Sequence, residues 1–85
     1  MSAQTQNGIE AFRRRARTED GHELVFLRCL RLGDRWMVEC EVHPRGTADE
    51  TTVRRGPYAF ASERAARAFA DQATLALEYL GCEIS

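Results

Sequence analysis

Apolar and polar positions along the chain divide it into strand-like segments followed by one long helical segment. In residues 62–80, apolar residues recur every three or four positions and fall within one arc of roughly 140° on a helical wheel. Ser62 is a favourable N-cap residue, and Gly81 supplies the left-handed stop that ends many helices. We therefore predict an amphipathic helix that packs on a sheet. The largest side chains of its apolar arc are Phe69, Leu77 and Leu80.

Residues 23–43 have the pattern of a β-hairpin. Gly33-Asp34 fits a two-residue type II′ turn, which makes the numbers of facing residues sum to 67. One face of the hairpin is then apolar along nearly its whole length, so the pattern itself supports this register. On the other face Arg28 meets Glu39, an opposite-charge cross-strand pair. We expect these residues to be buried beneath the helix: Val25, Leu27, Trp36, Val38 and Cys40.

The run FRRRAR, residues 12–17, allows two interpretations. A turn at Asp20-Gly21, a preferred type I′ dipeptide, makes the run a strand paired with the next one, and facing residues then sum to 41. Arg14 alone of its arginines would face inward, and an inward charge protects an edge strand from pairing with another chain. The alternative is a short helix over residues 8–17 with Asn7 as its cap.

The remaining segments complete a single domain over residues 9–85. Residues 1–8 are small and polar and suggest a flexible tail, and residues 44–50 suggest a loop. Residues 51–60 read as a last strand, which Gly56-Pro57 limits to an edge or a bulge.

The predicted fold class is α+β. An antiparallel β-meander of order β-β-β-β-α carries the C-terminal amphipathic helix on one sheet face. The order becomes α-β-β-β-α if residues 8–17 are helical instead.

Composition narrows the classes of function. The 85 residues are 44% hydrophobic, too apolar for a disordered chain, and 12 basic residues, all arginine, nearly balance 13 acidic ones. A dedicated duplex-DNA binder usually has a basic excess, which this chain lacks. The longest apolar run, LVFL, is far too short to span a membrane, and the N-terminal residues do not resemble a signal peptide. Three cysteines without pattern suggest reduced thiols, so we expect a cytoplasmic protein with no membrane association.

No combination of residues predicts catalysis. Cys40 and His43 have the spacing of two metal ligands, but residues three apart on a strand point to opposite faces. Ser62 is accounted for as a helix cap, and no glycine-rich phosphate loop is present. Cys82 is expected to pack on Leu77 at the helix end. We therefore predict no catalytic residue, no metal, no cofactor and no enzymatic activity.

The face of the sheet away from the helix is the first candidate binding surface. Arginines with an aromatic ring among them suit single-stranded nucleic acid, because the ring stacks on bases and the arginines contact phosphates. Glu39 and Glu41 lie alongside and have the wrong charge for that ligand. The alternative is a solvated face with internal charge pairing. The candidate residues are Arg13, Arg15, Arg17, Phe26 and Arg28.

Apolar residues outside the core suggest self-association. One group, Ile9, Leu30, Leu32 and Met37, lies at one end of the open sheet face. The other group is Leu75 and Tyr79, which belong to a second stripe on the helix together with Ala68 and Gln72. Exposing both Leu75 and Tyr79 to water is costly. We expect these apolar residues to contact either a flanking loop or a partner. The partner would be a second copy of the chain, which gives a homodimer, or an unknown protein.

Trp36 in the hairpin and YAFASERAARAFA, which leads the last strand into the helix, resemble small bacterial β-meander-plus-helix domains of unknown function. The resemblance covers roughly residues 22–80 and implies the fold alone. The β-β-β-β-α order is also similar to the single-stranded nucleic-acid-binding units of PUR-repeat and Whirly-type proteins, although no binding residue of those families matches. We expect a non-enzymatic cytosolic interaction or regulatory domain that forms a homodimer, with a single-stranded nucleic-acid-binding module as the alternative.

Overall fold

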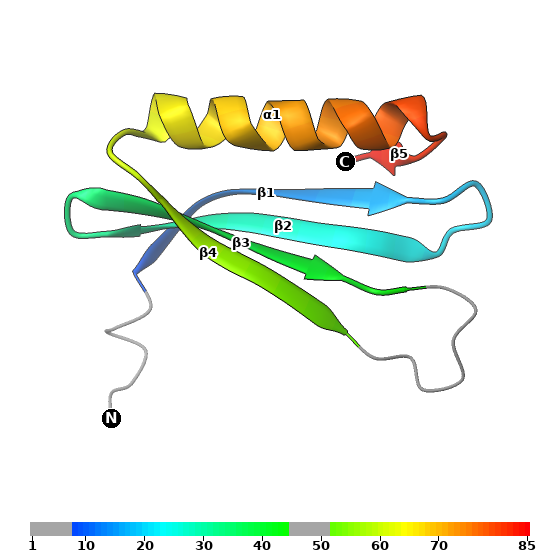
Figure 1. Ribbon diagram of the computed structural model, residues 1–85, viewed down its shortest axis with the longest axis horizontal. Helices are drawn as coiled ribbons and strands as arrows, with labels where there is room; N and C mark the ends of the chain where they lie inside the picture. The colour runs from blue at the N-terminus through cyan, green and yellow to red at the C-terminus, as the bar shows by residue number, and fades with distance from the viewer. Residues whose placement is uncertain (1–7, 45–51) are drawn as a thin grey trace.

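Four consecutive strands form an antiparallel meander, and one helix crosses one of its faces, in the computed structural model of the chain (Figure 1). The structure describes residues 8–44 and 52–85. The elements are β1 (Ile9–Arg17), β2 (Glu23–Leu32), β3 (Arg35–Val42), β4 (Val53–Phe60), α1 (Glu63–Tyr79) and β5 (Glu83–Ile84). The sheet order is β4-β3-β2-β1-β5.

This arrangement confirms the predicted α+β meander with its C-terminal helix. The alternative that began with a helix is wrong, because β1 is a strand paired along its length with β2. The predicted tail, residues 1–8, and the predicted loop, residues 44–50, lie almost wholly outside the described residues.

The β2–β3 hairpin has the predicted register. Val25 faces Val42 and Cys29 faces Val38, so facing residues sum to 67 throughout. The turn is the two residues Gly33-Asp34, and Gly33 has a φ of +65°, as the first central position of a primed turn requires.

The β1–β2 pairing has the predicted register in its centre, where Phe12 faces Cys29 and Ala16 faces Val25. The turn, however, is longer than the predicted two residues. The amide of Thr18 donates to the carbonyl of His22 at 2.9 Å, so three residues form the loop between them. A register shift after Ala16 compensates for the added residue and restores the sum of 41.

A short strand that the sequence did not predict covers part of β1. The amide of Arg15 donates to the carbonyl of Ser85 at 3.0 Å, and the amide of Ser85 donates back to the carbonyl of Arg15. Ala16 and Arg17 face the two residues of β5. The second half of β1 is therefore an inner strand, and only its first half lies at the edge of the sheet.

Both ends of α1 are capped as predicted. The Ser62 hydroxyl accepts a hydrogen bond from the amide of Ala65 at 3.1 Å. Gly81 has a φ of +95°, and the amide of Cys82 donates to the carbonyl of Leu77 at 3.0 Å, the long bond of a Schellman motif. Cys82 and Leu77 also pack in one hydrophobic cluster, which confirms the contact expected at this helix end.

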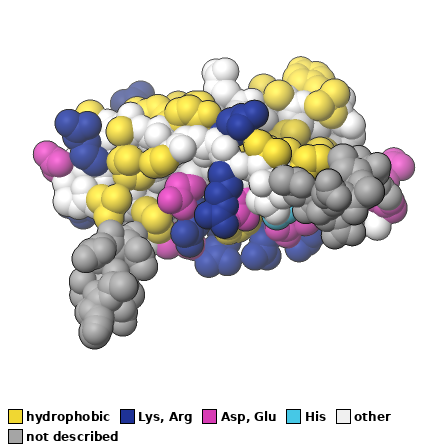
Figure 2. All heavy atoms as spheres, turned by 60° about the horizontal axis from the view of Figure 1, so that its bottom comes forward, with side chains coloured by type: hydrophobic (Ala, Val, Ile, Leu, Met, Phe, Trp, Pro, Cys, Tyr) yellow, Lys and Arg dark blue, Asp and Glu magenta, His cyan; other side chains and the backbone are white. Residues whose placement is uncertain are grey.

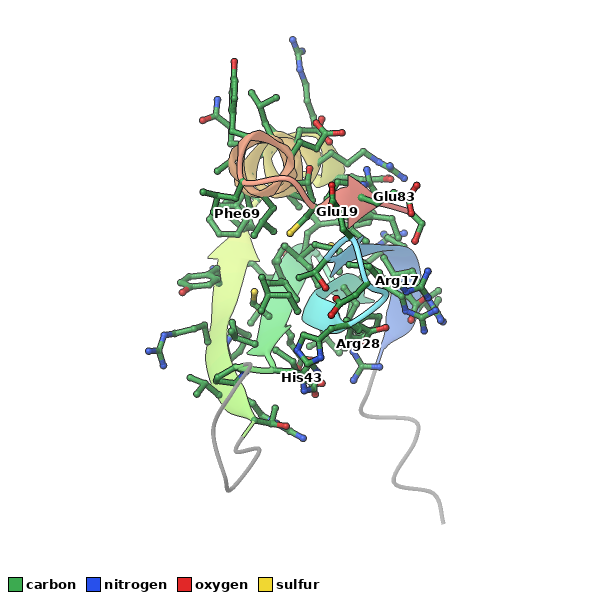
Figure 3. All side chains as sticks on the ribbon, turned by 90° about the vertical axis from the view of Figure 1, so that its right-hand side faces the viewer. Arg17, Glu19, Arg28, His43, Phe69 and Glu83 are labelled. Carbon is green, nitrogen blue, oxygen red and sulfur yellow. The ribbon has the colours of Figure 1, made fainter. Side chains whose placement is uncertain are left out.

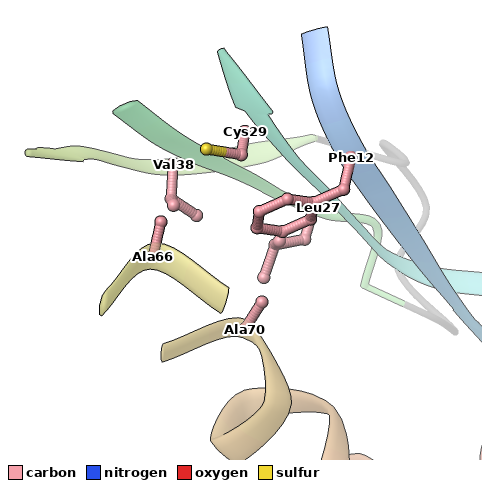
Figure 4. Packing of buried hydrophobic residues seen from close by; sticks show 6 residues of the cluster. All are labelled: Phe12, Leu27, Cys29, Val38, Ala66 and Ala70. Atoms are coloured by element: carbon pink, nitrogen blue, oxygen red, sulfur yellow. The ribbon is translucent and has the colours of Figure 1, made fainter. Parts of the chain in front are cut away.

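The core lies where α1 crosses the middle of the sheet. Leu27, Cys29 and Val38 are the largest fully buried side chains, and they face the methyl groups of Ala66 and Ala70 (Figure 4). Alanine at both helix positions lets the helix backbone lie close to the strands. Of the residues predicted to be buried, Trp36 and Cys40 are only half-buried.

The helix is rotated about its axis relative to the predicted apolar arc. Its buried residues are Ala66, Ala70 and Thr74, whereas Leu80, predicted as an anchor, is 78% exposed. Thr74 tolerates burial because its hydroxyl donates to the carbonyl of Ala70 at 3.0 Å.

Phe69 lies at the side of this buried line and reaches down towards β4 (Figure 3). Its ring packs at 5.2 Å from the ring of Tyr58 and at 5.4 Å from that of Phe60. These separations suit tilted aromatic pairs. The aromatic contacts therefore anchor the first half of α1 to β4.

Arg14 faces inward, as the edge-strand interpretation required. Its guanidinium lies 4.8 Å from the centre of the Phe12 ring and 3.6 Å from the Asp71 carboxylate of α1. It also donates to the carbonyl of Arg13 at 3.2 Å. Arg14 thus covers the side of the core and occupies a main-chain acceptor of β1.

We predict that Val38→Asp unfolds the protein, because the substitution places an unpaired charge in the fully buried layer. A chain of this size has a stability of about 4–13 kcal/mol, and we expect a loss of about 4 kcal/mol or more. Thermal and urea denaturation followed by circular dichroism measures the loss. Arg35→Asp, at an exposed position of the same strand, is the control and should stay within about 1 kcal/mol of the parent. Near-normal stability of Val38→Asp would contradict the assignment of this face.

Candidate interaction surfaces

The open sheet face, the face away from α1, carries the predicted arginine and phenylalanine residues together. The register puts Arg13 beside Arg28 and Arg15 beside Phe26, and the Arg15 guanidinium lies 5.4 Å from the centre of the Phe26 ring. Arg28 lies on the far side of the sheet from the helix (Figure 3). Arg17 was expected beside Leu24, but the register shift brings it opposite Glu23.

Carboxylates pair with the arginines of this face. Arg13 lies 2.7 Å from Glu10, Arg15 lies 3.5 Å from Glu23, and Arg28 lies 3.0 Å from Glu39. The last of these confirms the predicted cross-strand pair. Arg54 of β4 lies 3.5 Å from Glu41. In Figure 2, basic and acidic side chains are accordingly mixed along the lower side of the molecule.

Two of these carboxylates, Glu10 and Glu23, lie on the open face because the β1–β2 pairing contains two register shifts. In a regular strand, residues three apart point to opposite faces. The register shift between Glu10 and Phe12 adds one residue, which puts Glu10 on the same face as Arg13. The register shift after Ala16 likewise puts Glu23 on the open face, next to Arg15 and Arg17. Sequence reasoning therefore found the arginines but missed half of the acidic partners.

The apolar group expected at one end of this face is only partly exposed. Leu30 is buried, with 8% of its surface exposed, between its cross-strand neighbours Glu10 and Met37. Met37 is half-buried, and Leu32 is 37% exposed. Of the four residues, Ile9, which is 73% exposed, and Leu32 offer exposed apolar side chains.

The outer surface of α1 is divided into a charged side and an uncharged side. Arg64, Asp71 and Glu78 are exposed and seven residues apart, so they form one line along the helix. The other exposed helix positions carry no charge, and among them Leu75 is 52% exposed and Tyr79 is 84% exposed. The uncharged exposed residues are Ala65, Ala68, Gln72, Leu75, Ala76 and Tyr79.

The stripe of Ala68, Gln72, Leu75 and Tyr79 was expected at one edge of the buried arc. The rotation of α1 carries it further round, so that it faces away from the sheet. A shallow hollow of about 540 Å³ lies at its first half, lined by Ala68, Phe69, Gln72 and Ala73. Leu75 and Tyr79 project beside this hollow as the exposed apolar end of the stripe.

The two histidine side chains make hydrogen bonds within the fold. His22 Nε2 donates to the carbonyl of His43 at 2.9 Å, which ties the β1–β2 turn to the end of β3. His43 Nδ1 lies 3.2 Å from the Thr52 hydroxyl. Among residues 8–44 and 52–85, no three histidine, cysteine or acidic side chains are grouped as a metal site would require.

The three cysteines are free, and two of them, Cys29 and Cys40, have thiols of little nucleophilic character. Burial raises the pKa of Cys29 and of Cys40 above the ordinary value for a thiol. Both are therefore protonated at neutral pH, and the thiolate is the reactive form.

Comparison with protein-family models, with curated proteins and with solved structures finds no match to this chain. The resemblances to β-meander-plus-helix domains and to PUR-repeat or Whirly-type units therefore stay predictions. In the described part of the chain, no helix combines the length and the apolar character needed to cross a membrane.

We predict that Cys40 alone reacts with a thiol reagent in the folded protein at neutral pH. It is half-buried, whereas Cys29 and Cys82 are buried. Its raised pKa should make the reaction slower than that of a free cysteine. Mass spectrometry of labelled peptides, before and after unfolding in urea, measures how fast each of the three cysteines is labelled. Labelling of Cys29 as fast as Cys40 under native conditions would contradict the packing of β2.

Proposed function

We propose that this protein is a small non-enzymatic interaction domain that functions as a homodimer. The observation that supports the proposal is the uncharged outer side of α1, on which Leu75 and Tyr79 are 52% and 84% exposed. Large apolar side chains exposed together commonly mark a protein-binding surface. Three free thiols also favour a reducing compartment, and we propose the cytoplasm.

The first test is the mass in solution. Sedimentation equilibrium between about 10 and 300 µM, the range suited to a small interface, should approach twice the 9.6 kDa chain mass. Leu75→Glu should shift the equilibrium to the monomer, because it places a charge on the apolar surface. Ala59→Glu, at an exposed position of β4, is the matched control and should leave the mass unchanged.

Leu30→Glu tests the packing of the sheet and is not a probe of the open sheet face as an interface. Because Leu30 is buried, we expect the substitution to lower the melting temperature, whatever the oligomeric state. A parent protein that stays monomeric at the highest concentration would remove the proposal of a homodimer.

Binding of single-stranded nucleic acid on the open sheet face is the second candidate. The placement of the Arg15 guanidinium over the Phe26 ring supports it, because the ring and the arginines are near each other. Alternate arginines of β1 are spaced at ~6.5–7 Å by the strand repeat, close to the phosphate spacing of an extended strand. The carboxylates paired with Arg13, Arg15 and Arg28 oppose it.

A double substitution tests this candidate directly. Glu23→Gln with Glu39→Gln removes two of the paired carboxylates and should strengthen binding to a labelled single-stranded oligonucleotide. The affinity should fall steeply with salt, and Phe26→Ala should cost ~1–3 kcal/mol through lost stacking. Fluorescence anisotropy measures all three effects. If neither the parent nor the double variant binds at low salt, the candidate is excluded.

A further inference from the structure

The uncharged residues of α1 have the spacing of a helix-pairing seam. Ala65, Ala68, Gln72, Leu75 and Tyr79 are separated by three, four, three and four residues, the a/d pattern of paired helices. Such a seam buries its residues against another helix, and α1 is the only helix among the described residues. In Figure 1 the helix lies along one side of the molecule with the sheet beneath it, so its outer surface is open to a partner.

We infer that α1 packs antiparallel against α1 of a second copy, with Gln72 at the two-fold axis. This inference rests on the proposed homodimer and specifies its interface. The dimer would have four layers, with the two helices in the middle and the two sheets outside. The sheets would not collide, because the seam faces away from the sheet of its own chain.

The sizes of the seam residues favour the antiparallel orientation. One half of the seam is small, with Ala65 and Ala68, and the other half is large, with Leu75 and Tyr79. A two-fold axis at Gln72 brings Ala65 against Tyr79 of the second copy and Ala68 against Leu75. Each large residue then meets a small one, as close packing requires. A parallel pair would instead put tyrosine against tyrosine and leave space between the alanines.

The shape of the helix surface agrees with this pairing. The hollow of about 540 Å³, lined by Ala68, Phe69, Gln72 and Ala73, borders the small half of the seam, and a smaller hollow of about 250 Å³ is lined by Leu75, Glu78 and Tyr79. Leu75 and Tyr79 project from the large half. The two-fold axis places the projecting side chains of each copy at the larger hollow of the other.

Charges beside the seam are also complementary in the antiparallel pair. Arg64 of each copy lies opposite Glu78 of the other, which forms two equivalent pairs of opposite charge. Asp71 meets its own counterpart near the axis, but Arg14 of the same chain lies 3.6 Å from that carboxylate and offsets part of the repulsion. The Gln72 side chain can both donate and accept a hydrogen bond across the axis, and a polar seam residue fixes the register.

The interface is small, which sets the conditions of the test. A helix of 17 residues is about 25 Å long, so a single helix pair falls at the lower end of specific interface sizes. We therefore expect an association that is measurable at tens to hundreds of micromolar, the range of weak complexes.

Cysteine cross-linking distinguishes the two orientations. Gln72→Cys places two thiols next to each other across the axis, and mild oxidation should give a covalent dimer. Ala65→Cys places its thiols about 21 Å apart in the antiparallel pair, too far for a disulfide, but adjacent in a parallel pair. The protein without an added cysteine gives the background from its own thiols, and circular dichroism verifies that each exposed substitution keeps the fold.

A charge exchange provides the second measurement. Arg64→Glu and Glu78→Arg should each weaken the dimer about 3- to 10-fold, as expected for exposed ion pairs, and the two substitutions combined should restore it. Sedimentation at matched concentrations measures these changes at low salt.

The outcomes separate this inference from the proposed function. Rapid cross-linking of Gln72→Cys with none of Ala65→Cys, together with rescue by the combined charge exchange, supports the antiparallel interface. Cross-linking of Ala65→Cys as fast as Gln72→Cys overturns it. A stable dimer that survives Leu75→Glu also overturns it but leaves the proposed homodimer intact, whereas a parent that stays monomeric removes both.

Discussion

The packing of Ala66 and Ala70 on the centre of β2 and β3 determines how the rest of the molecule is arranged. These small side chains hold one helix close to the sheet along a single narrow line. A helix with its side chains is about 10–12 Å wide, whereas five strands about 4.8 Å apart span about 19 Å. One helix therefore covers only about half of the sheet, and no other element of residues 8–44 and 52–85 covers its outer surface. The candidate dimer surface is a consequence of this geometry.

The strands and their central registers could be predicted because short turns and period-two alternation act together. Glycine at the hairpin turns limits the connection, and a one-residue slip would turn every apolar residue outward. The bulges beside Glu10 and Glu23 could not be predicted, since each depends on one extra residue that alternation does not reveal. β5 was missed because two residues are too few to show a pattern.

The exposed stripe of α1 was predicted in composition but not in position. Many alanines in α1 leave its apolar arc poorly defined, and hydroxyl bonding at Thr74 together with aromatic packing at Phe69 decides the rotation. That rotation moves Leu75 and Tyr79 from the edge of the buried arc to the outside. Leu30 could be assigned to the open face from alternation, but its burial depends on side chains of both neighbouring strands.

The distribution of arginine supports the proposed association through α1 over association through the sheet. Arg14 donates to the carbonyl of Arg13 in β1, and Arg55 donates to the carbonyl of Arg54 in β4, so both outer strands of the meander carry a charged group at the main chain. Charged side chains on such strands oppose pairing with another chain. Arg13, Arg15 and Arg28 of the open face are paired with carboxylates, which offsets much of the positive charge of that face. The uncharged side of α1 has neither charged groups at an open main chain nor paired charges. A partner there would bury apolar surface without breaking an ion pair.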